Sequence, residues 1–420
     1  MIIHENPHGG LSNEEIRAAL QQALGGISGG RVLLLPPDIT RLNSYAGKLT
    51  ALCWELLASR CEIDVIPALG THIPMTREEQ RAFFGDAIPP ERFIVHNWRE
   101  DVATIGEVPA SYLREISEGL MDETVEVQIN RRLTTGGYDR ILSLGQVVPH
   151  EVAGMANYTK NILVGCGGSA MISKSHILGA LYGVERIMGR ADTPVRRLFD
   201  YAEERFLADI PLTYILTVTT TQGGRTALNG LYIGRERALF ERAAALSQQL
   251  NITYVDNPIE TCVVYLDPRE FRSAWLGNKA IYRTRMAMAE GGSLIILAPG
   301  VERFGEDSAN DALIRKYGYP GRERVLSLIR EREDLRANLS VAAHLIHGSS
   351  DNRFSVTYCT EKLSQAEVEG VGFAYCPYAK MVKLYDPSAL SDACSTVNGK
   401  EIYYISNPAL GLWAGKGGLG

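Results

Sequence analysis

VLLLPPDITR, residues 32–41, begins with an apolar run, is closed by two prolines and ends in a polar loop. Residues 43–58 follow with apolar positions at helical spacing, so the segment predicts a strand, a loop and a helix in succession. The loop carries Asp38, Thr40 and Arg41 at the position where the predicted strand ends. A strand followed by a polar loop and a helix is the repeating unit of α/β proteins, and we therefore search for its recurrence.

The same pattern recurs three times. Residues 63–66 precede Gly70-Thr71-His72 and a predicted helix over residues 76–84, and residues 141–144 precede Pro149-His150. Residues 161–164 precede the glycine-rich stretch 165–169 and predict a further strand. Strands that alternate with helices favour a mostly parallel sheet, in which ligands bind beyond the carboxyl ends of the strands. The polar residues after each run are therefore expected to share one edge.

A second region begins after a predicted helix over residues 237–250. It contains predicted strands at 253–255, 261–265 and 293–297 and a predicted long helix near 269–289. We therefore expect an α/β protein of two domains, each a mostly parallel sheet flanked by helices, with the active site in the interdomain cleft. The expected domains are residues 1–250 and 251–401, with 402–420 as a candidate for return to the first domain. Residues 251–258 are the expected linker and hinge.

The composition of the chain argues against several classes of function. The chain has 420 residues and a net charge of −6 with its basic residues dispersed, which argues against a nucleic-acid partner. No apolar run approaches the roughly 20 residues that cross a bilayer, and the N-terminus lacks the pattern of a secretory signal, so we expect a cytoplasmic protein without membrane association. Seven cysteines without a C-x-x-C pair predict reduced thiols. Cys166 is a candidate nucleophile, but a small residue filling a tight turn is the favoured interpretation.

Three histidines lie in segments suited to catalysis: His72, His150 and His176. Imidazole titrates near neutrality, so two such groups on opposite sides of a substrate can exchange acid and base roles, as a racemase requires. Lys160 stands ten residues after His150 and sixteen before His176. Each residue also has an ordinary interpretation, since a loop histidine is often a surface residue and Lys160 fits a solvated turn.

Taken in order, DITR at 38–41, Gly70-Thr71-His72, Pro149-His150-x3-Gly154, Lys160 and His176 resemble the signature of the lactate racemase superfamily. The resemblance is close over residues 30–180. It implies a nickel-pincer nucleotide attached covalently to Lys160, with His176 as the protein ligand to nickel. It also implies accessory proteins that make the cofactor.

The resemblance further implies a mechanism. His72 and His150 would flank the substrate, and one would take the hydroxyl proton while hydride passes from the substrate carbon to the cofactor. Hydride return to the other face would invert the carbon. Arg41 matches the arginine that holds the substrate carboxylate, for which a planar fork of donors is suited. Lys279 matches a second-domain lysine that reaches the substrate. Asp38 would orient Arg41 or the cofactor, or would cap a turn.

Departures from the pattern concern the substrate. Ile73 replaces an arginine of many members, Leu276 replaces a glutamine of the lactate enzymes, and Asn157-Tyr158 stand where Ser-Gly-Gly often precedes the lysine. We therefore expect a 2-hydroxy acid other than lactate. A sugar acid epimerised at its second carbon is an alternative, because Asn157 and Tyr158 offer groups for extra hydroxyls. A nickel-free nicotinamide-dependent dehydrogenase and a non-catalytic ligand-binding homologue also stay open, although no G-x-G-x-x-G turn follows the first strand.

Overall fold

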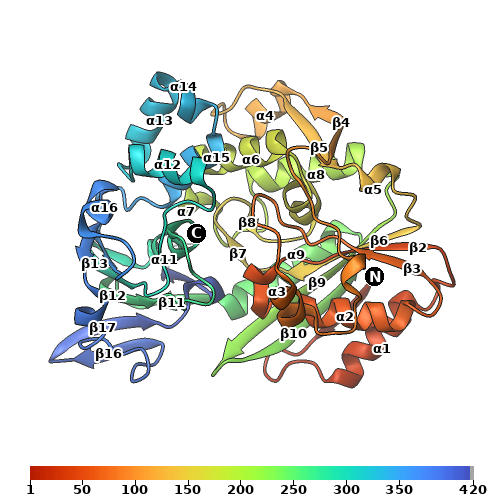
Figure 1. Cartoon of the computed structure of the whole chain (residues 1–420), viewed down its shortest axis with the longest axis horizontal. Coiled ribbons are helices and arrows are strands. Elements are labelled where there is room, and N and C mark those ends of the chain that lie inside the picture. The colour runs from red at the N-terminus through yellow and green to blue at the C-terminus, as the bar shows by residue number, and fades with distance from the viewer. Residues whose placement is uncertain (417–420) are drawn as a thin grey trace. The chain divides into compact units, whose positions relative to one another are not determined.

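Strand β2 (Arg31–Leu35) contains the apolar run of residues 32–35 and lies within a six-stranded sheet of the computed structural model, which describes residues 1–416. The strand order is β1-β10-β9-β6-β2-β3 (Figure 1). β3, β2, β6 and β9 run parallel, whereas β10 and β1 extend the sheet in antiparallel pairing. The predicted mostly parallel sheet is therefore confirmed in this part of the chain.

The remaining strands of this sheet are β1 (Ile2–Glu5), β3 (Glu62–Val65), β6 (Arg140–Gln146), β9 (Leu212–Gln222) and β10 (Arg225–Gly234). Its main helices are α1 (Asn13–Leu24), α2 (Ala46–Leu57), α3 (Arg77–Phe84), α6 (Ser169–Tyr182), α8 (Pro194–Phe206) and α9 (Arg237–Asn251). The shorter elements in this part of the chain are η1 (Ile39–Ser44), η2 (Pro90–Arg92), β4 (Val102–Val108), α4 (Ala110–Ile116), β5 (Val125–Asn130), α5 (Arg132–Thr135), β7 (Pro149–His150), β8 (Gly154–Met155) and η3 (Asn161–Gly165). The short helix α7 (Val184–Ile187) follows α6, but its residues 184–186 group with the later part of the chain.

Both faces of this sheet are covered by helices. Successive strand residues point to opposite faces, so Ile215 of β9 packs into the core formed with α1 and α2, while the adjacent Tyr214 points the other way. Tyr214 bonds to Glu203 of α8, and its ring lies 4.4 Å from that of Tyr158. This two-sided burial explains why the central strands are continuous apolar runs rather than alternating ones.

Local capping sets the helix starts. The Thr76 hydroxyl accepts a hydrogen bond from the backbone N–H of Glu79, and the Glu79 carboxylate accepts one from the backbone N–H of Thr76, so α3 begins where the sequence predicts a helix. Ser12 and Glu15 form the same reciprocal pair at the start of α1.

The predicted strand at residues 161–164 is wrong. The structure forms a buried π-helical turn, η3, over Asn161–Gly165. The Asn161 amide donates to the Leu35 carbonyl and to the Ser143 hydroxyl, which ties the turn to the ends of β2 and β6. A short buried apolar run does not distinguish a strand from a helical turn by periodicity, and here tertiary hydrogen bonds decide.

The second sheet also has six strands, in the order β15-β14-β13-β12-β17-β16. All neighbours are parallel except β16 and β17. Its strands are β12 (Ile259–Tyr265), β13 (Met288–Leu297), β14 (Ser355–Cys359), β15 (Ala374–Cys376), β16 (Ala393–Val397) and β17 (Lys400–Ile405), beside the pair β11 (Ile252–Val255) and β18 (Leu412–Gly415). Its helices are α10 (Ala274–Gly277), α11 (Lys279–Thr284), α12 (Ser308–Tyr317), α13 (Arg322–Glu331), α14 (Glu333–Arg336), α15 (Leu339–His347), α16 (Gln365–Gly370), α17 (Tyr378–Met381) and η4 (Pro408–Leu410).

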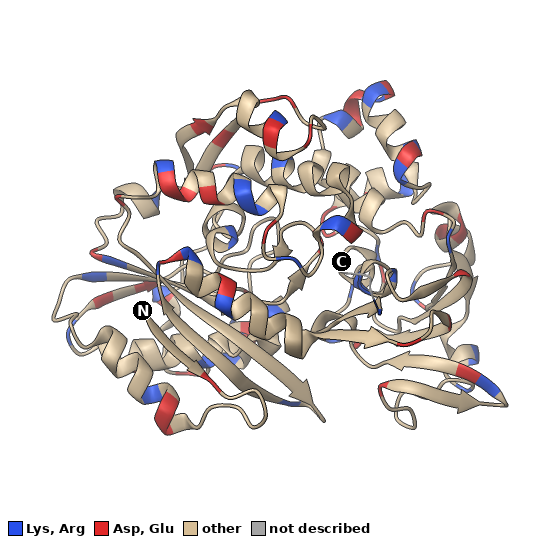
Figure 2. Cartoon of the chain, turned by 180° about the vertical axis from the view of Figure 1, so that it is seen from behind, with Lys and Arg blue, Asp and Glu red and all other residues tan. Residues whose placement is uncertain are grey.

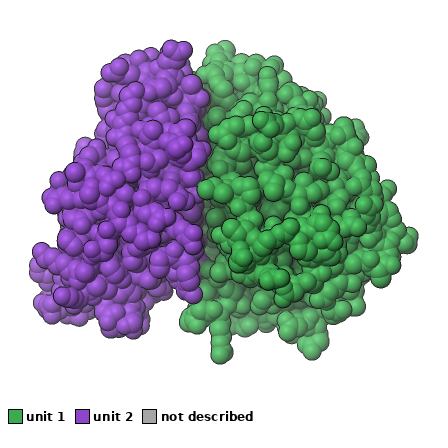
Figure 3. All heavy atoms as spheres, in the orientation of Figure 1, with its two compact units in different colours: residues 1–182, 187–251 green, residues 183–186, 252–420 purple. Residues whose placement is uncertain are grey.

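The chain divides into two compact units (Figure 3). The first unit comprises residues 1–182 and 187–251, and the second comprises residues 183–186 and those from 252 onward. Residues 402–416 lie in the second unit, because β17 pairs with β12 and β18 pairs with β11, so the predicted return to the first domain is wrong for these residues. Residues 417–420 of that prediction lie outside the described part.

Two further predictions in this region are corrected. The expected linker, residues 251–258, contains β11, which is held by β18. The expected long helix at 269–289 is replaced by the short helices α10 and α11, and β13 already begins at Met288. Asn278 separates α10 from α11, and the Ser273 side chain starts a new turn by capping Leu276.

Charged residues of both signs are interspersed over the helices and strand ends (Figure 2). Within residues 1–416, no helix combines the length and apolarity needed to traverse a bilayer.

Candidate active site

The loop after β2 is organised by Asp38. Its carboxylate accepts hydrogen bonds from the Thr40 backbone N–H at 3.1 Å and from the Thr40 hydroxyl at 2.5 Å, and so caps η1. The other carboxylate oxygen lies 2.6 Å from Nδ1 of His72, in the loop after the neighbouring strand β3. Asp38 thus caps a turn, which is one of the two roles that the sequence predicts, and it also orients a histidine, which the sequence does not predict.

The pair of Asp38 and His72 is poised for general-base chemistry. Asp38 is buried, and burial raises the pKa of its carboxyl group, but the charge and hydrogen bond of His72 and the bonds from Thr40 outweigh it, so the net pKa lies below 3.8. The carboxylate is therefore ionised at neutral pH, and whenever the His72 ring is neutral the carboxylate accepts the proton on Nδ1. Nε2 then carries the lone pair that can take a proton from a substrate.

Backbone geometry places His72. Gly70 has a left-handed backbone, with φ of +57°, and its N–H donates to the Gly165 carbonyl at 2.8 Å. The N–H of His72 donates to the Leu69 carbonyl. The histidine loop is thereby fastened to the end of η3, the turn that follows Lys160.

His150 lies in the small hairpin of β7 and β8 and is buried. Its Nδ1 accepts a hydrogen bond from the backbone N–H of Val152 at 3.1 Å, so neutral His150 carries its proton on Nε2. The Glu151 carboxylate lies 3.6 Å from the same Nδ1. His72 and His150 therefore have opposite tautomers. In the neutral state Nε2 of His72 is unprotonated, whereas Nε2 of His150 carries a proton.

Lys160 precedes η3 at its N-terminal end. Burial lowers the pKa of its amine to about 8, and the positive charges of Arg41 and Arg196 contribute, against the opposing effects of Glu151 and Asp38. No hydrogen-bond partner of this amine occurs within residues 1–416. The side chain is only partly exposed, which argues against the sequence alternative of a fully solvated turn.

Arg41 lies within η1, where its backbone departs from helical geometry at φ −113° and ψ 40°. It is half-buried, and its charge is the second largest influence on the pKa of Lys160. Coulombic effects of this size require proximity, so Arg41 belongs to the same cluster as Lys160.

His176 lies on α6, seven residues after its start at Ser169. Its Nδ1 is 2.6 Å from the Ile172 carbonyl and donates the ring proton to it, which leaves the lone pair on Nε2. Burial, together with the positive charge of Lys160, lowers the pKa of His176 to about 4. The ring is therefore neutral near pH 7, and no other hydrogen bond in the described chain reaches Nε2.

Lys279, the other predicted substrate-binding residue, lies in the second unit at the start of α11. It is buried, and its amine is 5.5 Å from the centre of the Phe271 ring. Leu276, at the position of the family glutamine, directs its backbone N–H to the Ser273 hydroxyl.

Asn157 and Tyr158 do not offer groups for extra substrate hydroxyls. Both are buried, and both have left-handed backbones, with φ of +62° and +58°. The Asn157 amide donates to the Leu144 carbonyl and accepts from the Tyr158 N–H, while the Tyr158 hydroxyl donates to the Arg235 carbonyl. These bonds remove the observation on which the sugar-acid alternative rested.

The glycine-rich stretch 165–169 is a structural turn. The N–H groups of Gly168 and Ala170 donate to the backbone and side-chain oxygens of Gln128, and that of Gly167 donates to Val164. Cys166 is buried, and burial raises the pKa of its thiol to about 12, which is incompatible with a nucleophile at neutral pH. All seven cysteines are free thiols, as predicted.

Two residues near the cluster escaped sequence reasoning. Glu151, beside His150, has no motif of its own. Arg196 of α8 is wholly buried. Thr193-Pro194 signals the start of α8, but nothing in the sequence shows that Arg196 faces inward.

Comparison with known proteins shows a related domain and a shared fold. Residues 11–186 match the family model of the lactate racemase N-terminal domain. No curated protein matches the sequence. Among solved structures, a protein from Thermotoga maritima is 24% identical, with a TM-score of 0.86 over 98% of this chain and 100% of that chain. The lactate racemase apoprotein from Thermoanaerobacterium thermosaccharolyticum is 16% identical, with a TM-score of 0.69 over 96% and 93%. At such identities the structures establish a common fold.

Proposed function

We propose that this chain, which belongs to the lactate racemase superfamily through its N-terminal domain, is an isomerase that inverts the hydroxyl-bearing carbon of a 2-hydroxy acid. The observation that carries the proposal is the pairing of two histidines with opposite tautomers, His72 held by Asp38 and His150 held by Val152. A racemase needs one group to accept a proton and another to donate one, and needs the roles to reverse.

The residues fit a nickel-pincer nucleotide. Because the pKa of its amine is lowered to about 8, Lys160 is neutral far more often near neutral pH than an ordinary lysine, so the amine is suited to covalent attachment. Nε2 of His176 offers an imidazole lone pair of the kind that nickel accepts. Within residues 1–416 no three His, Cys, Asp or Glu side chains form a metal-binding group, so other donors would have to come from the cofactor.

When bound, the cofactor would accept and return the hydrogen of the substrate carbon as hydride. The chain's own residues would manage protons and position. Arg41 would hold the carboxylate, Nε2 of His72 would take the hydroxyl proton, and the Nε2–H of His150 would hydrogen-bond the substrate oxygen. Asp38 would stabilise the imidazolium that forms on His72.

Glu151 has a proposed function when His72 and His150 exchange their acid and base roles. For His150 to act as the base, its proton must lie on Nδ1 and Nε2 must be bare. The Glu151 carboxylate, 3.6 Å from Nδ1, can accept that proton once the bond from Val152 opens. For His150 to serve as the acid it must be protonated on both nitrogens, and the same carboxylate would stabilise that charge.

The substrate is proposed to be a small-molecule 2-hydroxy acid other than lactate, because Ile73 and Leu276 replace an arginine and a glutamine of the family pattern. Accessory proteins of the host would supply the cofactor.

The decisive experiment is intact-protein and peptide mass spectrometry on protein from a cofactor-making host. We expect the wild-type protein to show a mass increase localised to Lys160 and stoichiometric nickel. The Lys160→Arg variant should show neither. A 2-hydroxy acid panel carrying deuterium at the second carbon then tests the chemistry, because hydride shuttling retains the label in the inverted product. Net oxidation with a nicotinamide nucleotide would favour the dehydrogenase alternative, and absence of both adduct and nickel would contradict the proposal.

A further inference from the structure

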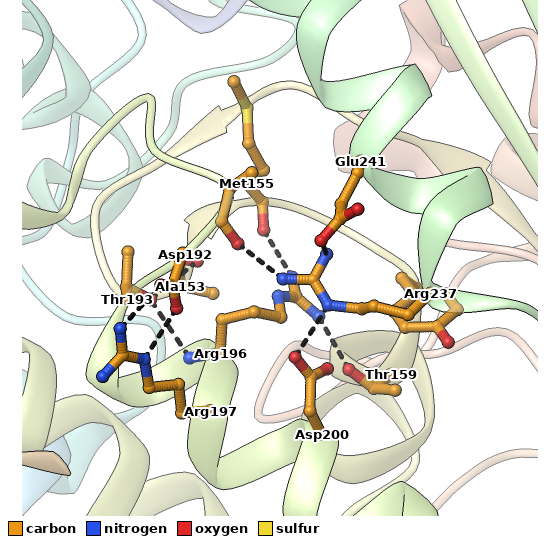
Figure 4. Close-up of polar contacts among 12 residues, drawn as sticks. Ala153, Met155, Thr159, Asp192, Thr193, Arg196, Arg197, Asp200, Arg237 and Glu241 are labelled. Atoms are coloured by element: carbon orange, nitrogen blue, oxygen red, sulfur yellow. Dashed lines mark hydrogen bonds and ion pairs between the residues drawn. The ribbon is translucent and has the colours of Figure 1, made fainter.

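Arg196 of α8 directs the two terminal nitrogens of its guanidinium group, Nη1 and Nη2, at the segment that precedes Lys160 (Figure 4), while its Nε is buried without a hydrogen-bond partner in the described chain. Nη1 donates to the Thr159 hydroxyl at 2.7 Å, and Nη2 donates to the carbonyls of Met155 at 2.7 Å and Asn157 at 3.3 Å. The side chain has no exposed surface. Three acceptors within five residues of chain are thus held by one buried cation.

A buried cation is costly to keep, and this one has no carboxylate within ion-pair distance in the part of the chain that the structure describes. The nearest helical acid, Asp200, bonds instead to Nε of Arg237 at 2.8 Å and acts on Arg196 only through space. Burial lowers the pKa of Arg196 to about 10, so it stays charged near neutrality. Its guanidinium carbon lies 4.3 Å from the centre of the Phe240 ring, which compensates part of the lost hydration.

The segment that Arg196 holds is conformationally demanding. Asn157 and Tyr158 are consecutive residues in the left-handed region, which costs on the order of 1 kcal/mol or more for each. Such a backbone persists only when its surroundings enforce it. The Arg196 bonds to Met155, Asn157 and Thr159 are distributed on both sides of the left-handed pair and provide that enforcement.

The start of α8 also holds the His150 hairpin. The Thr193 hydroxyl donates to the Ala153 carbonyl at 3.4 Å and caps Arg196. Gly154, with φ of +80°, lies close to the residues that precede α8. A Cβ atom at this position would lie 2.2 Å from the Arg190 carbonyl oxygen and 2.8 Å from the Thr193 side chain. One turn of helix therefore contacts both the histidine hairpin and the lysine segment.

We propose that Arg196 is a positioning residue for Lys160: its guanidinium fixes the left-handed backbone that carries this lysine and holds the amine at the place of cofactor attachment. This inference rests on the proposed function, in which Lys160 bears the cofactor. The electrostatics agree, because the charge of Arg196 adds to burial and to Arg41 in lowering the pKa of Lys160.

The test uses the full-length apoprotein and three variants. Arg196→Met removes both the charge and the planar set of guanidinium donors, and Arg196→Lys keeps a charge without that set of donors. Arg197→Met is the matched control, since Arg197 is the next residue of α8 but is exposed and pairs with Asp192.

Two quantities are measured. Hydrogen exchange of peptides spanning residues 153–165 reports the backbone. The pH profile of Lys160 acetylation by an N-hydroxysuccinimide ester, with exposed Lys48 as internal reference, reports the amine. Wild type should show a midpoint at about 8. In Arg196→Met, exchange should rise about tenfold or more because charge-assisted bonds are lost, and the midpoint should move to higher pH.

Arg196→Lys should raise exchange while moving the midpoint less, and Arg197→Met should match wild type in both. If Arg196→Met does not fold, Thr159→Val and Thr159→Ser replace it: loss of the hydroxyl should raise exchange, and serine should restore protection. Wild-type exchange and wild-type profiles in both Arg196 variants would overturn the inference. Because both readouts use apoprotein, they stay interpretable if the loaded protein shows no adduct on Lys160, an outcome that would contradict the proposed function alone.

Discussion

The carboxylate of Asp38 and Nδ1 of His72 lie 2.6 Å apart, although the two residues come from loops after different strands. The pair meets because β2 and β3 are adjacent and parallel, so their carboxyl ends lie at one edge. In neutral His72 this bond decides which ring nitrogen lacks a proton, and in the proposed function that nitrogen makes the first proton transfer.

Replacing Asp38 with Asn tests that assignment. The Asn amide would donate to Nδ1 and shift the ring proton to Nε2, so turnover should fall about 10²-fold or more. Steady-state kinetics with the loaded enzyme measure it. Thr40→Val is the control, because it removes a bond to the same carboxylate but leaves the histidine contact. Near-wild-type turnover of the Asp38→Asn protein would show that the tautomer is immaterial.

Measurements of racemisation and of bound nickel should distinguish the roles of the three histidines. His72→Ala and His150→Ala should each reduce racemisation by about 10² to 10⁴ while nickel stays bound. His176→Ala should lose the metal, as measured by elemental analysis of the purified protein. Retention of stoichiometric nickel after His176→Ala, or normal racemisation after His72→Ala, would refute the respective role.

His176 also makes a prediction about acid stability. Burial lowers its pKa to about 4, whereas an unfolded histidine has an ordinary value near 6.5. Between these values the unfolded chain binds the proton and the folded chain does not, so stability is full above pH 6.5 and declines as the pH falls toward 4. Urea unfolding of apoprotein at pH 7 and pH 5 should show a larger loss for wild type than for His176→Gln. Equal losses would mean that the ring is accessible to protons in the folded state.

Gly154→Ala should damage the His150 hairpin. Its left-handed φ and the Arg190 carbonyl, 2.2 Å from a Cβ atom, both oppose a side chain, so we expect destabilisation of about 3 kcal/mol or more in urea unfolding. Gly119 has a similar φ of +84° with nothing within 4 Å, and Gly119→Ala isolates the backbone cost of about 1 kcal/mol. Equal effects of both substitutions would argue that the close approach is relaxed in solution.

Cys166→Ala should keep racemase activity and cost about 1 kcal/mol of stability, because the thiol fills a turn rather than attacking substrate. Under iodoacetamide, exposed Cys394 should be alkylated first and Cys166 last, as peptide mapping can follow. Loss of activity on Cys166→Ala with unchanged folding would reinstate the nucleophile interpretation.

Sequence patterns predict the strand ends well because strand, proline and polar loop are local signals, and β2, β3 and β6 lie where expected. They fail where tertiary bonds override a short apolar run, as in η3, whose conformation depends on the Asn161 amide reaching Leu35 and Ser143. The long helix at 269–289 fails because the Ser273 cap and the Asn278 break leave no periodicity signal.

The candidate site residues also differ in whether the sequence alone can identify them. The sequence alone identifies His72, His150, Lys160 and His176 as candidates, because their spacing forms a pattern. The partner of His72 is not, since Asp38 has an equally good local explanation as a cap. Arg196 escapes altogether, because its importance lies in an inward orientation that only the packed helix reveals.

The shared support at the start of α8 has a consequence for how substrate range can change. Because one helical turn bonds to both the His150 hairpin and the lysine segment, a displacement of that turn would shift the two together. Mutational drift that enlarges or reshapes the substrate pocket is therefore expected at loop positions such as Ile73, which can vary without detuning the catalytic spacing.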